Sequence, residues 1–274
     1  MSAGGSVEEW GRYAPRGIAA VGIGLTRRRI VRGALRRVVG NAVGRMQPCF
    51  DVLVDGLKMR CRAHDNATEW GLIFTGARQD RRGRDVILSE LAPGDVFVDV
   101  GANCGAFTLF AARMLGTRGR VVAIEPMPQM VERLQFNVAA NALANVEIFA
   151  TAVGAGAGES TLYVDETHRG MSSMSRVDGY KPTTVPVVTL AALIAQAGIE
   201  RIDALKIDIE GYEDRVLLPF IETATRTLWP KRIFMETTWS GRWERDCVDG
   251  LLANGYEDAW RSGGDVLLRL RQAA

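Results

Sequence analysis

Five acidic side chains lie in or directly after apolar, β-branched runs of this chain: Asp99, Glu125, Asp208, Glu210 and Glu236. Such runs predict the strands of a buried, mostly parallel sheet. In open α/β sheets ligands bind beyond the carboxyl ends of the strands, so these acids are expected at one ligand-binding edge. Carboxylates there can accept hydrogen bonds from hydroxyls, take a proton or hold a divalent ion.

A glycine turn follows the first of these runs, in the segment Asp99-Val-Gly101-Ala-Asn-Cys-Gly105. Gly101 and Gly105 let the backbone turn tightly into a helix whose first N–H groups face the crevice. The Gly-x-Gly-x-x-Gly phosphate fingerprint is missing, which disfavours a diphosphate ligand. Glu125 lies 24 residues after Gly101, where doubly wound folds hydrogen-bond a ribose diol.

These groups together suit S-adenosylmethionine, which joins an adenosine to a zwitterionic tail. We expect Asp99 to contact its ammonium group, the turn amides to bind its carboxylate and Glu125 to hold its ribose hydroxyls. The simpler alternative is an ordinary strand–turn–helix unit whose glycines serve close packing. An NAD-dependent oxidoreductase is less favoured because the phosphate fingerprint is missing.

Three motifs, at residues 93–105, 123–126 and 206–213, occur in the order found in a known family. On these motifs the chain, over roughly residues 69–236, resembles the FkbM-type methyltransferases. The resemblance implies a methyltransferase that depends on S-adenosylmethionine. Its expected reaction is O-methylation of a hydroxyl on a sugar, a glycan, a lipid-linked glycan or a related secondary metabolite.

The resemblance also implies roles for further residues. Asn103 lies in the cofactor turn, and adenine is expected near Ala152, at the end of the third core strand. Ser172 and Ser173 resemble a serine-rich stretch near the cofactor and substrate, although both can equally be solvated loop hydroxyls. In one departure Ala191 follows Thr-Leu, where the family usually has an acid, and this concerns a local loop contact.

Methyl transfer to an alcohol needs a group that accepts the hydroxyl proton. Glu210 is our first choice of base, Asp208 is expected to orient the methyl donor or the substrate, and Lys206 to neutralise these acids. Asp208, Glu210 and Glu236 could instead share Mg²⁺ or Mn²⁺, which would polarise the hydroxyl. A third interpretation is that the acids only form salt bridges with arginines at the sheet edge.

The order of the predicted elements indicates an α/β fold with a doubly wound, mostly parallel sheet, similar to the Rossmann-like fold of class I methyltransferases. Core strands are expected at 96–100, 120–124, 146–153, 204–209 and 232–235, with a closing antiparallel hairpin at 255–260 and 265–270. A hairpin at 50–62 and helices at 69–77 and 84–91 should precede them. A β-excursion with a mobile loop around His168 is expected within 154–186. We predict three parts: a basic amphipathic extension (1–48), a hairpin and helical lead-in (49–92) and the methyltransferase domain (93–274).

The N-terminal segment is strongly basic. Residues 1–48 carry nine Arg against Glu8 and Glu9, a net charge of +7, so with +2 overall the remainder carries −5. Over residues 27–46 apolar side chains recur at helical steps, with arginines on the opposite side. Such a helix can bind an anionic membrane surface, or it can pack its apolar stripe on the catalytic domain.

Other classes of protein are less consistent with the sequence. The apolar run at 18–25 has eight residues, too few to span a bilayer, and no signal sequence is expected. Nucleic-acid binding is not expected because the arginine-rich segment has no aromatic residue from Ile18 to Cys49. The four dispersed cysteines suggest reduced thiols.

We therefore expect a cytoplasmic enzyme, peripheral on the inner face of the membrane if the basic helix binds there. A non-catalytic peripheral-membrane protein is the alternative.

Overall fold

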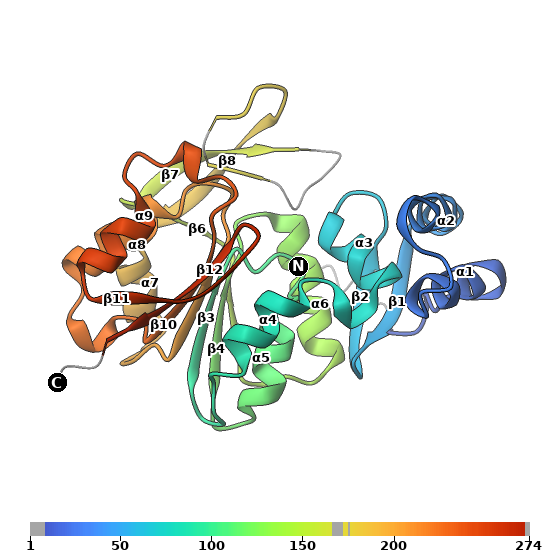
Figure 1. Cartoon of the computed structure of the whole chain (residues 1–274), viewed down its shortest axis with the longest axis horizontal. Coiled ribbons are helices and arrows are strands. Elements are labelled where there is room, and N and C mark those ends of the chain that lie inside the picture. The colour runs from blue at the N-terminus through green and yellow to red at the C-terminus, as the bar shows by residue number, and fades with distance from the viewer. Residues whose placement is uncertain (1–8, 166–171, 175, 272–274) are drawn as a thin grey trace, which may run out of the picture.

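The computed structural model describes residues 9–165, 172–174 and 176–271. Its main element is a seven-stranded sheet with the order β11-β12-β10-β9-β3-β4-β5 (Figure 1). Adjacent strands from β5 to β10 pair in parallel, whereas β12 and β11 complete the sheet as an antiparallel hairpin. The strands are β3 (Val96–Val100), β4 (Arg120–Ile124), β5 (Val146–Phe149), β9 (Ala204–Ile207), β10 (Arg232–Glu236), β11 (Tyr256–Ser262) and β12 (Asp265–Leu270). This confirms the doubly wound α/β fold.

Helices cover both faces of this sheet (Figure 1). One face packs against α4 (Arg81–Leu88), α5 (Thr108–Leu115) and α6 (Pro128–Ala140), and the other against α7 (Leu190–Gln196), α8 (Asp214–Thr223) and α9 (Cys247–Ala253). Side chains alternate along a strand, so Val96, Val98 and Val100 of β3 join one apolar core while Phe97 joins the other. The same alternation places Asp99 on the face of Phe97, next to α5.

The predicted strand at 146–153 is wrong as a single strand. It divides into β5 and the two-residue β6 (Ala152–Val153), which belong to different sheets. β6 pairs with β8 (Lys181–Val188), and β8 pairs with β7 (Gly158–Val164) in a three-stranded sheet. Between β5 and β6 the Thr151 hydroxyl donates to the carbonyl of Pro186 at 3.0 Å, next to the point where the chain joins β8. The predicted β-excursion is confirmed, and His168 lies outside the described residues.

The N-terminal part consists of a hairpin and three helices. The predicted hairpin is confirmed as β1 (Cys49–Val54) and β2 (Leu57–Arg62), and α3 (Ala67–Phe74) and a 3₁₀ turn, η1 (Gly76–Arg78), follow it. The Asn137 side chain of α6 accepts the Arg60 amide of β2 at 2.7 Å, which joins this part to the main domain.

The predicted helix over residues 27–46 is wrong at its start. Arg27 ends an earlier helix, α1 (Gly17–Arg27), and α2 spans Gly33–Met46. Arg29 and Gly33 have left-handed backbone angles, φ 62° and 55°, and these interrupt the helix between them. The Arg27 guanidinium donates to the carbonyls of Leu53, Leu72 and Ile73 at 2.7–2.8 Å, so it holds α1 to the hairpin and α3. Among the described residues, no helix is both long enough and apolar enough to cross a membrane.

Asp203, which lies just before β9, binds the start of β3 and two basic side chains. Its substitution tests how much these contacts stabilise the sheet. Its buried carboxylate accepts the amide of Val96 at 2.9 Å, Lys231 Nζ at 2.7 Å and Arg201 Nε at 2.9 Å. Burial opposes ionisation, but these hydrogen bonds outweigh it and lower the pKa of Asp203.

We predict that Asp203→Ala lowers the free energy of unfolding by about 2–3 kcal/mol, because the Val96 amide stays buried without its acceptor. Urea unfolding followed by circular dichroism measures this loss. Asp258→Ala removes an exposed ion pair with Arg261 and should cost less than about 1 kcal/mol. Equal losses in the two variants would contradict the anchoring role of Asp203.

Candidate active site

A pocket opens at the carboxyl ends of β3, β4 and β9, where the strand order reverses on the two sides of β3. Its empty volume, part of it open to solvent, is about 860 Å³. Seven predicted cofactor, catalytic and substrate residues line it: Gly101, Asn103, Glu125, Ala152, Ser172, Asp208 and Glu210. The fold therefore brings these predicted residues together at one pocket.

Gly101 is where the ends of β3 and β9 come closest. A Cβ at this position would lie 2.1 Å from the carbonyl oxygen of Asp208, and the φ of 75° also favours glycine. The amides of Gly101 and Ala102 both donate to the carbonyl of Ile124 at 3.0 Å. The amides of residues 103–105 also donate within the chain. The expectation that these turn amides bind a ligand carboxylate is therefore wrong for this geometry.

Gly105 serves packing. Its φ is 95°, and a Cβ would lie 2.4 Å from Leu109 and 2.7 Å from Leu134, two side chains of the core. It is not among the residues that line the pocket, in contrast to our expectation. The turn residues that face the pocket are Ala102, Asn103, Ala106 and Phe107, besides Gly101.

Asp99 lies behind the pocket wall, which corrects the expected direct contact with a ligand ammonium group. Its side chain is fully buried and accepts the Thr108 hydroxyl at 2.6 Å. Lys206 Nζ lies 3.4 Å from Asp99 Oδ1 and donates to the carbonyls of Val100 and Gly101 at 3.2 and 2.7 Å. Burial lowers the pKa of Lys206, but Asp99 and Asp208 outweigh it and raise the pKa overall. Lys206 was predicted to neutralise Asp208 and Glu210; in the structure its ion pair is with Asp99, and the charge of Asp208 acts on it as well.

Glu125 lies at the end of β4 with its carboxylate almost fully buried. One carboxylate oxygen accepts the Asn103 amide at 2.8 Å and the other accepts the Met127 amide at 2.9 Å. Burial raises the pKa of Glu125 to about 7, although both of these hydrogen bonds lower it. Each carboxylate oxygen has two acceptor positions, so one on each remains for a ligand in the pocket.

The two predicted substrate serines have different positions. Ser172 lines the pocket, with its hydroxyl 3.7 Å from the Met127 sulfur. Ser173 is buried, and its hydroxyl donates to the carbonyl of Glu210 at 2.9 Å. Ser173 is not among the pocket-lining residues, so its expected contact with a substrate is replaced by support of the Glu210 backbone.

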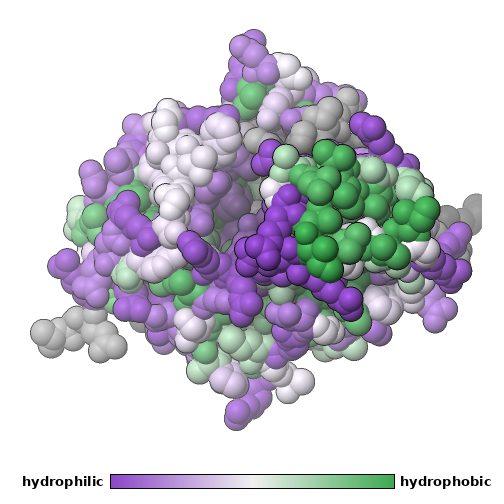
Figure 2. All heavy atoms as spheres, turned by 45° about the vertical axis from the view of Figure 1, so that its right-hand side comes forward, coloured by the Kyte–Doolittle hydropathy of each residue, from purple (hydrophilic) through white to green (hydrophobic). Residues whose placement is uncertain are grey.

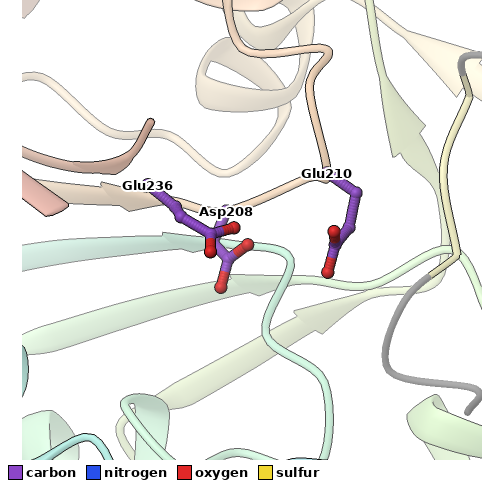
Figure 3. A group of neighbouring side chains, drawn as sticks. All are labelled: Asp208, Glu210 and Glu236. Atoms are coloured by element: carbon purple, nitrogen blue, oxygen red, sulfur yellow. The ribbon is translucent and has the colours of Figure 1, made fainter. Parts of the chain in front are cut away.

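Three carboxyl groups meet beside the pocket. Asp208 and Glu210 follow β9 and Glu236 ends β10, and one oxygen of each lies within 4.8 Å of the others. Figure 3 shows Asp208 and Glu236 beside one another, with Glu210 reaching down from the next turn. Burial is the main cause that raises the pKa of Glu210 to about 8, and the charges of Asp208 and Glu213 add to it. Burial and the hydrogen-bonded Asp208 raise the pKa of Glu236 to about 9. The cluster therefore retains protons at neutral pH.

Glu210 is held by residues to which our prediction gave no role. Its backbone is left-handed, with φ 58°, and its carbonyl accepts Arg242 Nη1 at 3.0 Å in addition to the Ser173 hydroxyl. Glu213 accepts the amides of Ile209 and Gly211 at 2.9 and 3.2 Å and Trp243 Nε1 at 2.7 Å. Glu213 thus ties the ends of this turn together. In the sequence, the only sign of this role was the acid Glu213, two residues after Gly211.

A second cavity adjoins the pocket and shares Asn103, Phe107, Asp208 and Glu210 with it. We call it the acidic chamber, because five carboxyl groups line it: Asp80, Asp208, Glu210, Glu236 and Asp265. Burial, followed by the charge of Asp208, raises the pKa of Asp265 to about 6. Neither Asp80 nor Asp265 was predicted, since each lies outside the ends of the parallel strands.

A groove beside α2 adjoins the acidic chamber. The chamber and the groove share Asn66 and Ala67, and the groove is otherwise lined by side chains that include Arg37, Arg45 and His64. The site therefore changes from acidic at the strand ends to basic beside the N-terminal helices. Only the fold places these two regions next to each other.

The pocket fits S-adenosylmethionine. Gly101 lets the end of β3 pack against the end of β9, so that residues from both strand ends line the pocket, and Glu125 keeps acceptor positions for two hydroxyls. Ala152, Val153 and Leu162 give one wall an apolar surface suited to adenine. The acids lie at the other side of the pocket, where it joins the chamber.

Known proteins with similar sequences show to which family the chain belongs. The family model described as the methyltransferase FkbM domain matches residues 99–272. The 31-O-demethyl-FK506 methyltransferase FkbM of Streptomyces tacrolimicus is 33% identical over 202 residues, 62% of this chain and 74% of that protein. Methyltransferase sdnD of Sordaria araneosa is 29% identical over 161 residues, 47% of this chain and 62% of that protein. A methyltransferase structure from Geobacter sulfurreducens, 20% identical, has a TM-score of 0.42 and covers 71% of this chain and 79% of its own.

The matched region begins within β3 and ends after β12, so it includes the glycine turn, Glu125 and all three clustered acids. Membership of a methyltransferase family argues against the alternative of an NAD-dependent oxidoreductase. The chain belongs to the FkbM methyltransferase family, whose members use S-adenosylmethionine as methyl donor.

Proposed function

We propose that this protein methylates a hydroxyl oxygen of a sugar, a glycan, a lipid-linked glycan or a related secondary metabolite. The main support is the position of Glu210, which lines both the cofactor pocket and the acidic chamber. A hydroxyl bound in the chamber can therefore approach the methyl donor and a carboxylate at the same time. The name of the Streptomyces relative, which specifies an O-demethyl compound, also supports oxygen as the acceptor.

Glu210 is the proposed base. Bound S-adenosylmethionine supplies an electrophilic methyl group, and the protein has to orient the acceptor and remove its proton. The Glu210 carboxylate accepts the hydroxyl proton as the oxygen attacks, and a pKa of about 8 makes it a stronger base than an ordinary glutamate. Asp208 and Glu236 share a hydrogen bond and present further acceptors to the substrate.

The lining of the acidic chamber favours an acceptor with several hydroxyls. Its five carboxyl groups can each accept a hydrogen bond from a hydroxyl, and those that are protonated can also donate one. Phe107 and Phe234 add apolar surface, with their ring centroids 5.7 Å apart. A sugar ring has this combination of polar edges and apolar faces.

Glu125→Ala tests the cofactor site. We expect at least a tenfold loss of affinity for S-adenosylhomocysteine, since hydrogen bonds to a charged group contribute about 1.5–3 kcal/mol. Isothermal titration calorimetry measures this, and Glu125→Gln, which keeps one carbonyl acceptor, should lose less. Glu132→Ala, at an exposed position on α6, is the matched control. If Glu125→Ala folds normally and binds as tightly as the control, Glu125 does not hold the cofactor.

Glu210→Gln tests the base. The substitution keeps the shape of the side chain and removes the proton acceptor, so the rate should fall by roughly 10²–10⁴ while cofactor binding changes little. In the unmodified protein the base must be ionised, so in chelated buffer the rate should rise with pH and level off above about 8. Steady-state methyl transfer from labelled S-adenosylmethionine measures both effects. Glu200→Gln, at an exposed position, is the control. Wild-type turnover by Glu210→Gln would refute the assignment.

A divalent cation is the other use that we propose for the three clustered acids. Asp208, Glu210 and Glu236 offer oxygen ligands within 4.8 Å of one another, and Mg²⁺ or Mn²⁺ bound there would polarise the hydroxyl.

The two mechanisms differ in their response to chelation. If a cation takes part, EDTA should abolish methyl transfer, and Mg²⁺ or Mn²⁺ should restore it. If Glu210 acts alone, the dialysed protein should keep its full rate in EDTA. Metal analysis of the purified protein is the independent check, because a tightly held ion can survive a short treatment. A protein without turnover in either state, but with intact cofactor binding, would favour the non-catalytic alternative.

A further inference from the structure

The N-terminal helices leave a group of large apolar side chains exposed. Six side chains in α1, α2 and the turn between them are 57–70% exposed: Ile18, Val21, Ile30, Leu35, Val38 and Met46. Figure 2 shows the apolar residues of this region gathered in one patch, with hydrophilic residues along its edge. Contiguous apolar patches on a protein surface mark sites of interaction. We call this group the apolar patch.

The apolar residues of α2 divide into a packed set and a neighbouring exposed set. Val39 and Val43 pack against the core. Leu35, Val38 and Met46, at spacings of three and eight residues, lie together on an exposed side of the helix. The helix therefore satisfies its contact with the domain without using these three residues.

Arginines surround the apolar patch, and no acid balances them nearby in the sequence. From Trp10 to Phe50 there are nine Arg and neither Asp nor Glu. Seven of these arginines are exposed: Arg12 and the six residues Arg16, Arg28, Arg29, Arg32, Arg37 and Arg45. Within the part of the chain that the structure describes, none of the six forms an ion pair with an acid.

We propose that this face docks on an anionic membrane surface, with the apolar patch inserted between the lipid headgroups and the arginines bound to their phosphates. A surface with apolar side chains flanked by arginine is the pattern of interfacial helices. A second copy of the chain would bring the same arginines together without acids to pair with them, so self-association through this face is disfavoured. Nucleic acid would leave the apolar patch without a complementary surface.

Docking in this way would make the groove the entry route for the acceptor. This part of the proposal rests on the proposed methyl transfer. Arg37 and Arg45 belong to α2 and line the groove that leads through Asn66 and Ala67 to the acidic chamber. An acceptor attached to a lipid could enter from the membrane surface, with its anionic linkage beside the arginines and its hydroxyl among the acids. Membrane binding itself does not depend on turnover, so the two proposals can fail separately.

Co-sedimentation of the full chain with vesicles tests the docking. We expect binding to vesicles of equal parts phosphatidylcholine and phosphatidylserine in low salt, at least tenfold weaker binding in high salt, and little binding to phosphatidylcholine alone. Leu35→Gln with Val38→Gln should weaken binding at least tenfold, since both side chains are exposed and the fold does not need them. Arg28→Gln with Arg37→Gln should weaken it about fivefold per arginine.

Arg82→Gln with Arg118→Gln is the matched control, because it removes the same charge from exposed positions outside α1 and α2. It should bind nearly as well as the unchanged chain. The proposal is overturned if the full chain does not bind anionic vesicles in low salt, or if the apolar variant and the control bind equally. It is also overturned if light scattering shows a dimer that the apolar variant dissociates, since a second copy would then cover the patch.

Discussion

The close approach of β3 to β9 is the constraint on which the rest of the site depends. Gly101 lies against the carbonyl of Asp208 with no space for a side chain. Lys206 joins the same two strands, since its ammonium group donates to two carbonyls of the β3 turn and pairs with Asp99. A buried ion pair is costly to desolvate, and these additional hydrogen bonds offset that cost. The arrangement brings the ends of both strands to one pocket.

The proposed chemistry also depends on the close packing of the strand ends. Asp208, Glu210 and Glu236 are crowded at the end of two adjacent strands and partly withdrawn from water, which raises the pKa of both glutamates. Glu213 and Arg242 hold the turn that carries Glu210, although neither belongs to the carboxyl cluster. A base of this kind needs burial and a fixed backbone together, and the segment after β9 provides both.

The N-terminal arginines serve two different purposes. Arg27 uses its guanidinium to bind three backbone carbonyls and so belongs to the structure of the protein. Arg37 and Arg45 remain exposed along the groove next to the acidic chamber. Charges of opposite sign that lie far apart in the sequence are thereby placed along two adjoining cavities.

The sequence by itself determined the sheet, the position of the pocket and the grouping of its acids. Apolar runs specify buried parallel strands, and parallel strands bring their carboxyl ends to one edge, so Asp208, Glu210 and Glu236 had to lie near one another. The glycine turn and Glu125 were recognisable for the same reason, because their spacing is fixed by a single strand–helix–strand unit.

Only the tertiary structure decided what depends on contacts between distant segments. Asp99 is turned toward Lys206 because strand alternation and the register with β9 place both on the face of α5. Asp80 and Asp265 enter the chamber from a helix start and an antiparallel hairpin, which no strand-end pattern identifies. The chain leaves the main sheet after β5 because β6 pairs with β8, a strand about 35 residues further along the sequence. Periodicity likewise marks α2 as amphipathic, but which of its apolar residues stay exposed depends on how closely α1 and α3 pack against it.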